Sequence, residues 1–178
     1  MRRVRVQSYR PSKSAKLLAE YLQVKRIQHT NSRFRGKSSD VIINWGNVNE
    51  VHPSCYLNPL QSVKDAANKI TTFTKLQASN VSIPTFHLSK SDLQPDTIYL
   101  ARTTVSGHSG EGIIVGTSED LPLAPLYTQF INKKHEYRAI VVADKVVDMK
   151  KKLKKRDFEG DRSPYIWNCD NGYIFARN

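Results

Sequence analysis

The sequence predicts an α+β protein in which a small α/β region precedes a longer region that is rich in strands. Two observations favour this class. Near the N-terminus, short β-branched runs flank a single helical pattern, and further along several β-branched or aromatic runs are separated by turn residues. The chain has 178 residues, of which 39% are hydrophobic and 25% charged, so it is long enough for one globular domain or two small ones.

Residues 1–57 are expected to form the small α/β domain. Val4–Tyr9 predicts a strand, and Pro11-Ser12 predicts the start of a helix that continues to about Leu22. The apolar residues of this helix that we expect to face the sheet are Leu17, Leu18, Tyr21 and Leu22. Residues 31–39 are polar and basic, which indicates a loop, and Asp40–Gly46 predicts a buried strand that ends in a turn.

Residues 58–178 form the second predicted region. It begins with a helical stretch from Asn58 to about Ser79, and we expect a break near Ile70–Thr72. Val81–Phe86 is expected to be extended, because a residue before proline avoids the helical conformation. The later strands are expected around Arg102, at the run that ends at Val115, at Leu126–Ile131, Glu136–Ala143 and Val146–Lys152, and as a pair within Ile166–Asn178 that turns at Asp170–Gly172.

The stretch Ala101–Val115 is the most informative part of the chain. Gly107, Gly110 and Gly112 lie between two expected strands, where glycine permits tight bends and lets backbone N–H groups approach a ligand closely. Arg102 precedes this loop and supplies a positive charge for the same ligand. Such a loop is typical of a phosphate cover, and a plain turn between two strands has the same glycine content.

The runs after this loop carry charged residues at regular positions. Leu126–Ile131 is followed by a polar linker and then by a strand that holds Glu136 and Arg138. Alternation in the last of these strands places three side chains on one face, namely Asp148, Lys150 and Lys152, and Lys151 on the other. A lysine run is also typical of a solvated strand end or a nucleic-acid patch, and the pattern alone leaves these alternatives open.

The region from about Asn58 to the end resembles the nucleotide-binding part of the ATP-grasp superfamily, most closely its small bacteriophage members. The resemblance rests on an ordered set of elements: a strand, the glycine loop, a second strand, a hinge at residues 129–131, the strand with Glu-x-Arg and the lysine strand. The resemblance implies ATP as the nucleotide. The residues that it implies for ATP binding are Arg102, Gly107, His108, Ser109, Gly110, Gly112, Gln129, Phe130, Ile131 and Glu136. The residues that it implies for catalysis are Arg102, Arg138, Lys150 and Lys152, through contact with the transferred phosphate or the acyl substrate.

The resemblance implies a carboxylate–amine ligase, in which ATP phosphorylates a carboxylate and an amine then displaces phosphate from the acylphosphate. It also implies Mg²⁺, held in family members by later strands that include a Glu-x-Asn motif. We expect that segment to be missing here, because aligning Phe175–Asn178 with the motif places Ala176 where the family has its Glu. No metal ligand is therefore assigned, and the expected ATP-grasp-type fold is incomplete at its C-terminus. The alternative is a grasp-like protein that has lost catalysis and binds nucleic acid or an acidic partner.

The net charge of +12 bears on the class of partner. Such a charge would attract ATP, an acidic peptide or protein substrate, or the phosphates of nucleic acid, and charge alone leaves these partners open. No apolar run approaches the length of a membrane span, so no membrane partner is expected. Cys55 and Cys169 lack metal-binding spacing and indicate a reducing cytoplasm, which would be the host cytoplasm for a phage-encoded protein.

Overall fold

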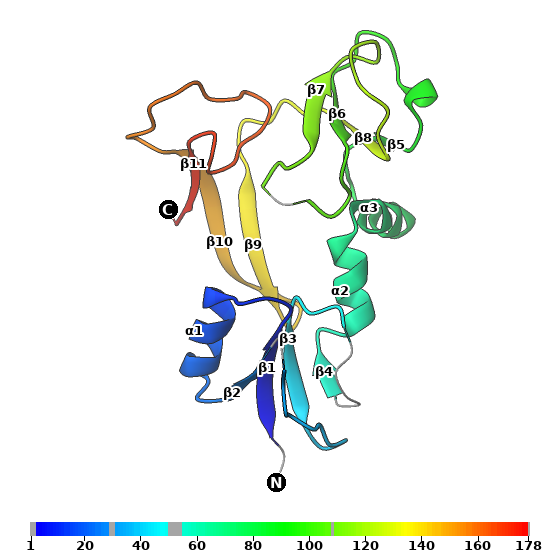
Figure 1. Cartoon of the computed structure of the whole chain (residues 1–178). Coiled ribbons are helices and arrows are strands. Elements are labelled where there is room, and N and C mark those ends of the chain that lie inside the picture. Colours follow the sequence, from blue (N-terminus) through cyan, green and yellow to red (C-terminus); the bar gives the residue numbers. More distant parts are fainter. Residues whose placement is uncertain (1–2, 29–30, 50–54, 108, 178) are drawn as a thin grey trace. The chain divides into compact units, whose positions relative to one another are not determined.

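The computed structural model describes residues 3–28, 31–49, 55–107 and 109–177. It confirms the α+β class, since short helices accompany three separate sheets (Figure 1). The chain forms two compact units, Met1–Thr74 and Lys75–Asn178. The sequence analysis places the domain boundary earlier, at residue 57, and the two divisions differ only in where they assign the helices between them. No described helix is long and apolar enough to cross a membrane.

The first unit is built on a parallel sheet whose strand order is β2-β1-β3-β4. Its strands are β1 (Val4–Ser8), β2 (Lys25–Ile27), β3 (Val41–Trp45) and β4 (Cys55–Leu57). The expected strands β1 and β3 form its centre. The three-residue strands β2 and β4 were not expected, because so short a run carries no pattern of its own and gains its hydrogen bonds only from the neighbouring strand.

Helix α1 (Lys13–Tyr21) lies against one face of this sheet (Figure 1). It begins where expected, since the Ser12 hydroxyl accepts a hydrogen bond from the Ala15 backbone N–H at 3.2 Å. The expected apolar stripe is wrong in part. Ala15 and Ala19 are the residues buried against Val6, whereas Leu17 is 65% exposed and Tyr21 is 88% exposed. The small alanine side chains allow the helix to lie close to the sheet, and Leu18 fills the edge of the contact.

Two helices follow the first sheet, α2 (Leu60–Ala67) and α3 (Lys69–Ala78). The expected break between them occurs at Asn68, slightly before the predicted position. Asn68 has an extended backbone, and its side-chain oxygen accepts a hydrogen bond from the Thr71 N–H at 3.1 Å. Asparagine is favoured at this position because it satisfies an otherwise unpaired N–H at a helix start.

The second unit contains two antiparallel sheets. The order in the first is β5-β8-β6-β7 and in the second β11-β10-β9. The strands of the first sheet are β5 (Phe86–His87), β6 (Tyr99–Arg102), β7 (Ile113–Gly116) and β8 (Leu126–Gln129). Its buried core includes Tyr99, Ala101, Leu121 and Tyr127, with the 3-10 turn Lys90–Asp92 beside Leu93 at its edge.

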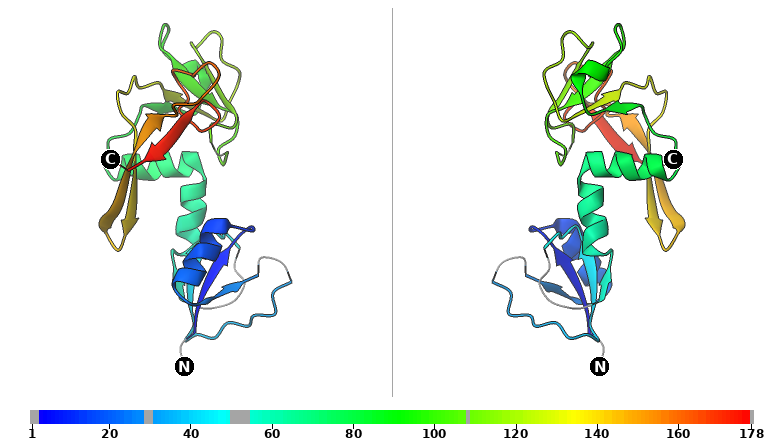
Figure 2. Two further views of the ribbon diagram at one scale, coloured as in Figure 1. Left: turned by 90° about the vertical axis from the view of Figure 1, so that its left-hand side faces the viewer. Right: turned by 90° about the vertical axis from the view of Figure 1, so that its right-hand side faces the viewer.

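The second sheet is dominated by a long hairpin of β9 (Tyr137–Val142) and β10 (Lys145–Lys154), which Figure 2 shows from two sides. Its turn residues Ala143 and Asp144 have positive φ angles of 47° and 63°, as tight hairpin turns require. The strand pair expected within Ile166–Asn178 is wrong in part. Among the residues of this range that the structure describes, only β11 (Tyr173–Ala176) forms a strand, and residues 155–172 are irregular.

One carboxylate of the first unit is buried and held by three donors. Asp40 accepts a hydrogen bond from Arg3 Nε at 2.9 Å, a second from Arg3 Nη2, and one from the Lys37 backbone N–H at 2.8 Å. The hydrogen bonds from Arg3 lower the pKa of Asp40 well below its ordinary value, against the opposing effect of burial. The pair joins the residue that precedes β1 to the residue that precedes β3.

Because the pKa of Asp40 is lower in the folded chain, its contribution to stability is present above the ordinary carboxyl pKa and is lost as the pH falls toward the folded value. We therefore expect the first unit to lose stability progressively below about pH 4, the ordinary range of an Asp. Asp40→Asn should be less stable at neutral pH and should lose less on acidification. Denaturant unfolding followed by Trp45 fluorescence, in a Trp167→Phe background, measures this unit alone. Parallel acid profiles for the two proteins would contradict the assignment.

Candidate functional site

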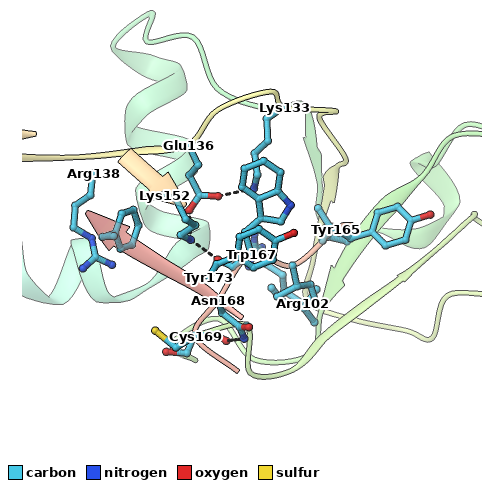
Figure 3. A pocket seen from close by; sticks show the side chains of 16 residues that line it. Arg102, Lys133, Glu136, Arg138, Lys152, Tyr165, Trp167, Asn168, Cys169 and Tyr173 are labelled. Carbon is cyan, nitrogen blue, oxygen red and sulfur yellow. Dashed lines mark hydrogen bonds and ion pairs between the residues drawn. The ribbon is translucent and has the colours of Figure 1, made fainter. Parts of the chain in front are cut away.

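A pocket of about 390 Å³ lies within the second unit. Residues from both of its sheets line it, together with part of the irregular segment before β11 (Figure 3). Its lining residues are Leu100, Arg102, Ser109, Gly110, Ile113, Lys133, Glu136, Arg138, Lys152, Tyr165, Ile166, Trp167, Asn168, Cys169, Tyr173 and Phe175. The volume falls within the range of small-molecule and cofactor sites, roughly 300–1,000 Å³.

The pocket lining contains more cations than carboxylates. Four are cations, Arg102, Lys133, Arg138 and Lys152, and one is a carboxylate, Glu136. Converging cations reinforce one another's field most where they are shielded from water, and Arg102 and Lys152 are at least partly buried. The pocket therefore favours an anionic ligand that carries more than one negative charge.

Strand alternation positions Arg102. On β6, Tyr99 and Ala101 are buried in the core, so Leu100 and Arg102 point to the opposite face and line the pocket. The Nε atom of Arg102 is buried and has no hydrogen-bond partner among the described residues. Burial lowers the pKa of this guanidinium. A buried donor without a partner costs roughly 1–3 kcal/mol or more when charged, so an anion that contacted Arg102 would recover that free energy.

Glu136 lies between two lysines (Figure 3). Its Oε2 is 2.7 Å from Lys133 Nζ, and its Oε1 accepts a hydrogen bond from Lys152 Nζ. Burial alone would raise the pKa of Glu136, but the hydrogen bonds from the two lysines outweigh it and lower the pKa. Lys152 is only 9% exposed and also donates to the Trp167 carbonyl. Its ammonium group is thus fixed at the pocket wall, not free in solvent.

Aromatic rings form the other side of the pocket. Trp167 stacks on Tyr173, with ring centroids 5.1 Å apart and an angle of 5° between the planes. Lys133 Nζ lies 5.0 Å from the Trp167 ring centroid, and the Arg138 guanidinium lies 4.0 Å from that of Phe175. Trp167 and Phe175 therefore each hold a cation at the pocket surface.

The glycine loop is held against the irregular segment. The Asn168 side-chain N–H donates to the Ser109 carbonyl. Gly110 has a φ of +91°, and a Cβ atom there would lie 2.9 Å from Ile166 Cγ2, so the close approach requires glycine. Gly112 instead closes the base of the loop, where its carbonyl accepts the Thr103 N–H at 2.8 Å. The loop is therefore shaped by one glycine that permits contact and another that permits the turn.

The structure brings together some of the residues that the sequence singled out and leaves others apart. Those that line the pocket are Arg102, Ser109, Gly110, Glu136, Arg138 and Lys152. Those outside its lining are Gly107, Gly112, Gln129, Phe130, Ile131 and Lys150. His108 lies outside the described residues.

The expected hinge, residues 129–131, and Lys150 each lie outside the pocket lining for a physical reason. The backbone N–H groups of Gln129 and Phe130 already donate to the carbonyls of Thr85 and Ile98, both at 2.8 Å. The Phe130 ring reaches the pocket only indirectly, through an edge contact with Tyr165 at 5.0 Å. Lys150 shares the face expected for it but lies 3.6 Å from Asp148, which also binds Arg177.

Sequence analysis did not assign a role to several lining residues, above all Lys133, Tyr165, Trp167, Asn168, Tyr173 and Phe175. For Lys133 the sequence did offer a signal of its pairing with Glu136, because it precedes Glu136 by three residues in the linker before β9. In the sequence, Tyr165 and Trp167 form only a Tyr-x-Trp pair, and Tyr173 and Phe175 form only part of an expected strand. Their convergence depends on the path of the irregular segment, which local patterns do not specify.

The described residues include no group of three or more His, Cys, Asp or Glu side chains that could hold a metal ion. The one carboxylate of the pocket is already bound by two lysines. The lining therefore offers Mg²⁺ no carboxylate that is free of a lysine partner.

The Asn168 contact generates a prediction about the glycine loop. Asn168→Ala removes the donor to Ser109 and should raise hydrogen exchange of the Thr103 and Ile113 amides, which bond within the loop. A loss of about 0.5–1.5 kcal/mol is expected, the usual net value of one hydrogen bond. Asn171→Ala is the matched control, because Asn171 supports the same segment through the Ile166 carbonyl without contacting the loop. Equal exchange in the two variants would show that Asn168 does not hold the loop.

No protein-family model and no curated protein matches this sequence. The residues and their geometry are therefore the basis for inferring what the pocket binds. Within that geometry, the decisive features are the four cations, the unpaired buried donor of Arg102 and the stacked aromatic wall.

Proposed function

We propose that the pocket of the second unit binds ATP and that the chain is an ATP-grasp-type protein, either a carboxylate–amine ligase or the nucleotide-binding part of one. The observation that carries the proposal is the buried, unpaired Nε atom of Arg102, in a pocket whose lining has three cations more than carboxylates. ATP carries about four negative charges near neutral pH, and protein sites for it combine cations with backbone donors.

The arrangement of the two sheets also supports the proposal. Arg102 comes from β6 of one sheet, and Lys152 comes from β10 of the other. In register with Lys152, Phe175 on β11 lies beneath its ammonium group at 4.6 Å. A polyphosphate placed between the sheets would thus contact a guanidinium from one side and an ammonium from the other. The lining also contains aromatic side chains, a residue type suited to packing against a nucleobase.

In the ligase reaction that the resemblance implies, a carboxylate oxygen attacks the γ-phosphorus and ADP leaves, after which an amine displaces phosphate from the acylphosphate. Arg102 and Lys152 would stabilise the charge on the moving phosphoryl group, the main contribution of a protein to phosphoryl transfer. Arg138 would contact the acyl substrate or a phosphate. Glu136 would hold Lys133 and Lys152 in position and would meet the ribose hydroxyls only by sharing its oxygens with these lysines.

The test is ATP binding by calorimetry to single-charge variants of the full chain. Arg102→Gln should weaken binding by about 1.5–3 kcal/mol, or roughly tenfold to 150-fold, the range for hydrogen bonds to charged groups. Lys152→Gln should also weaken binding. Lys151→Gln is the matched control, because Lys151 is the next residue of the same strand and lies outside the pocket lining. Lys150→Gln should resemble this control, since its ammonium group is paired with Asp148.

Absence of ATP binding by the unaltered protein would refute the proposal. The ligase step has its own readout, in which ATP, polyglutamate as the carboxylate and hydroxylamine as the amine should give a hydroxamate. ATP binding without hydroxamate, with several carboxylates tried, would favour a grasp-like binding protein that lacks catalysis.

A further inference from the structure

The positive charge of the chain is concentrated in the unit that does not contain the pocket. Met1–Thr74 holds 13 of the 28 Lys and Arg residues but only 4 of the 16 Asp and Glu residues, a formal net charge of +9 out of +12. The second unit accounts for the remaining +3, although it supplies every cation of the pocket. A nucleotide site in the second unit therefore explains little of the excess positive charge, most of which lies in the first unit.

Part of this charge lies on one face of the first sheet. Val6 is buried against α1, so alternation along β1 directs Arg5 to the opposite face, and Arg3, just before the strand, follows the same alternation. On that face their guanidinium groups lie 4.9 Å and 5.8 Å from the centroid of the Phe34 ring. The ring brings the loop of residues 31–39 onto the same face, and with it the exposed side chains of Arg33 and Arg35.

The loop is fixed to the sheet, not left as a free tail. Arg3 Nη2 donates to the Arg35 carbonyl at 2.9 Å, and the Lys37 N–H donates to Asp40 at 2.8 Å. Asp40 itself is buried and paired with Arg3, so it does not neutralise the outward arginines. A basic surface on a fixed scaffold loses less conformational entropy on binding than a mobile basic tail.

We propose that this surface, made of Arg5, Arg33, Phe34 and Arg35 and here called the arginine face, binds the phosphate backbone of a nucleic acid. Guanidinium groups bind phosphate oxygens through two parallel hydrogen bonds and also stack on planar rings. An aromatic ring interleaved with arginines is suited to a strand that presents phosphates and bases together. Contacts to phosphates carry no base information, so binding is expected to be independent of sequence and sensitive to salt. The proposal is independent of the nucleotide pocket.

The test is fluorescence anisotropy of the full chain with a labelled, mixed-sequence DNA duplex and the corresponding single strand. Arg33→Gln/Arg35→Gln removes two exposed charges and leaves the backbone carbonyl of Arg35 for Arg3. On the duplex, the slope of log K against log salt should become less negative by about 1.8, for two phosphate contacts at about 0.9 each. Affinity at about 0.1 M salt should fall tenfold or more on the same argument.

The matched control is Lys154→Gln/Lys155→Gln, which removes the same charge from two exposed positions of the second unit. It should change the slope and affinity much less, and both variants should retain the thermal unfolding of the unaltered chain. Equal losses in the two variants would overturn the proposal, as would no binding to either probe at low salt. Polyglutamate competing as well as the duplex at equal charge concentration would also overturn it, since the partner would then be an acidic polypeptide.

Discussion

The pocket depends on positive charge that partly buried side chains hold in place. The backbone of Arg102 is fixed, because the buried side chains of Tyr99 and Ala101 hold the other face of its strand in the core. Lys152 is similarly fixed by Glu136, the Trp167 carbonyl and the Phe175 ring. Like charges confined in this way repel one another, and a single carboxylate offsets them only in part. An anionic ligand relieves this repulsion, which is the physical basis of the proposed function.

Alternation along strands was the sequence argument that worked best for the site. It placed Lys152 on the opposite face from Lys151, and the same alternation accounts for the position of Arg102 in the structure. It did not distinguish Lys152 from Lys150, because both lie on the same face. That distinction depends on the neighbours, Glu136 for one lysine and Asp148 for the other. Pairing across strands is a property of the fold, and spacing along one strand does not report it.

Other features of the site could not be predicted, for reasons that differ from residue to residue. Trp167 and Asn168 belong to a segment without regular structure, whose path depends on contacts between side chains and backbone, such as the one between Asn171 and the Ile166 carbonyl. The N–H groups of Gln129 and Phe130 donate to the carbonyls of Thr85 and Ile98, a pairing that the sequence of this segment does not reveal. In the first unit, the start of α1 was evident from Ser12, but its buried face was not. The large apolar residues of the helix were expected to pack on the sheet, but Ala15 and Ala19 make the contact with Val6.

The comparison of ATP with adenosine tests the central claim most directly. In a Trp45→Phe background, Trp167 is the only tryptophan of the chain, and it lies at the pocket wall beside Lys133. Titration of its fluorescence should show saturable binding of ATP that is at least tenfold tighter than that of adenosine, because the cations act on the phosphates and one tenfold step needs only about 1.4 kcal/mol. Equal affinity for the two ligands, or no change with either, would contradict the claim that the charge of this pocket serves a nucleotide polyphosphate.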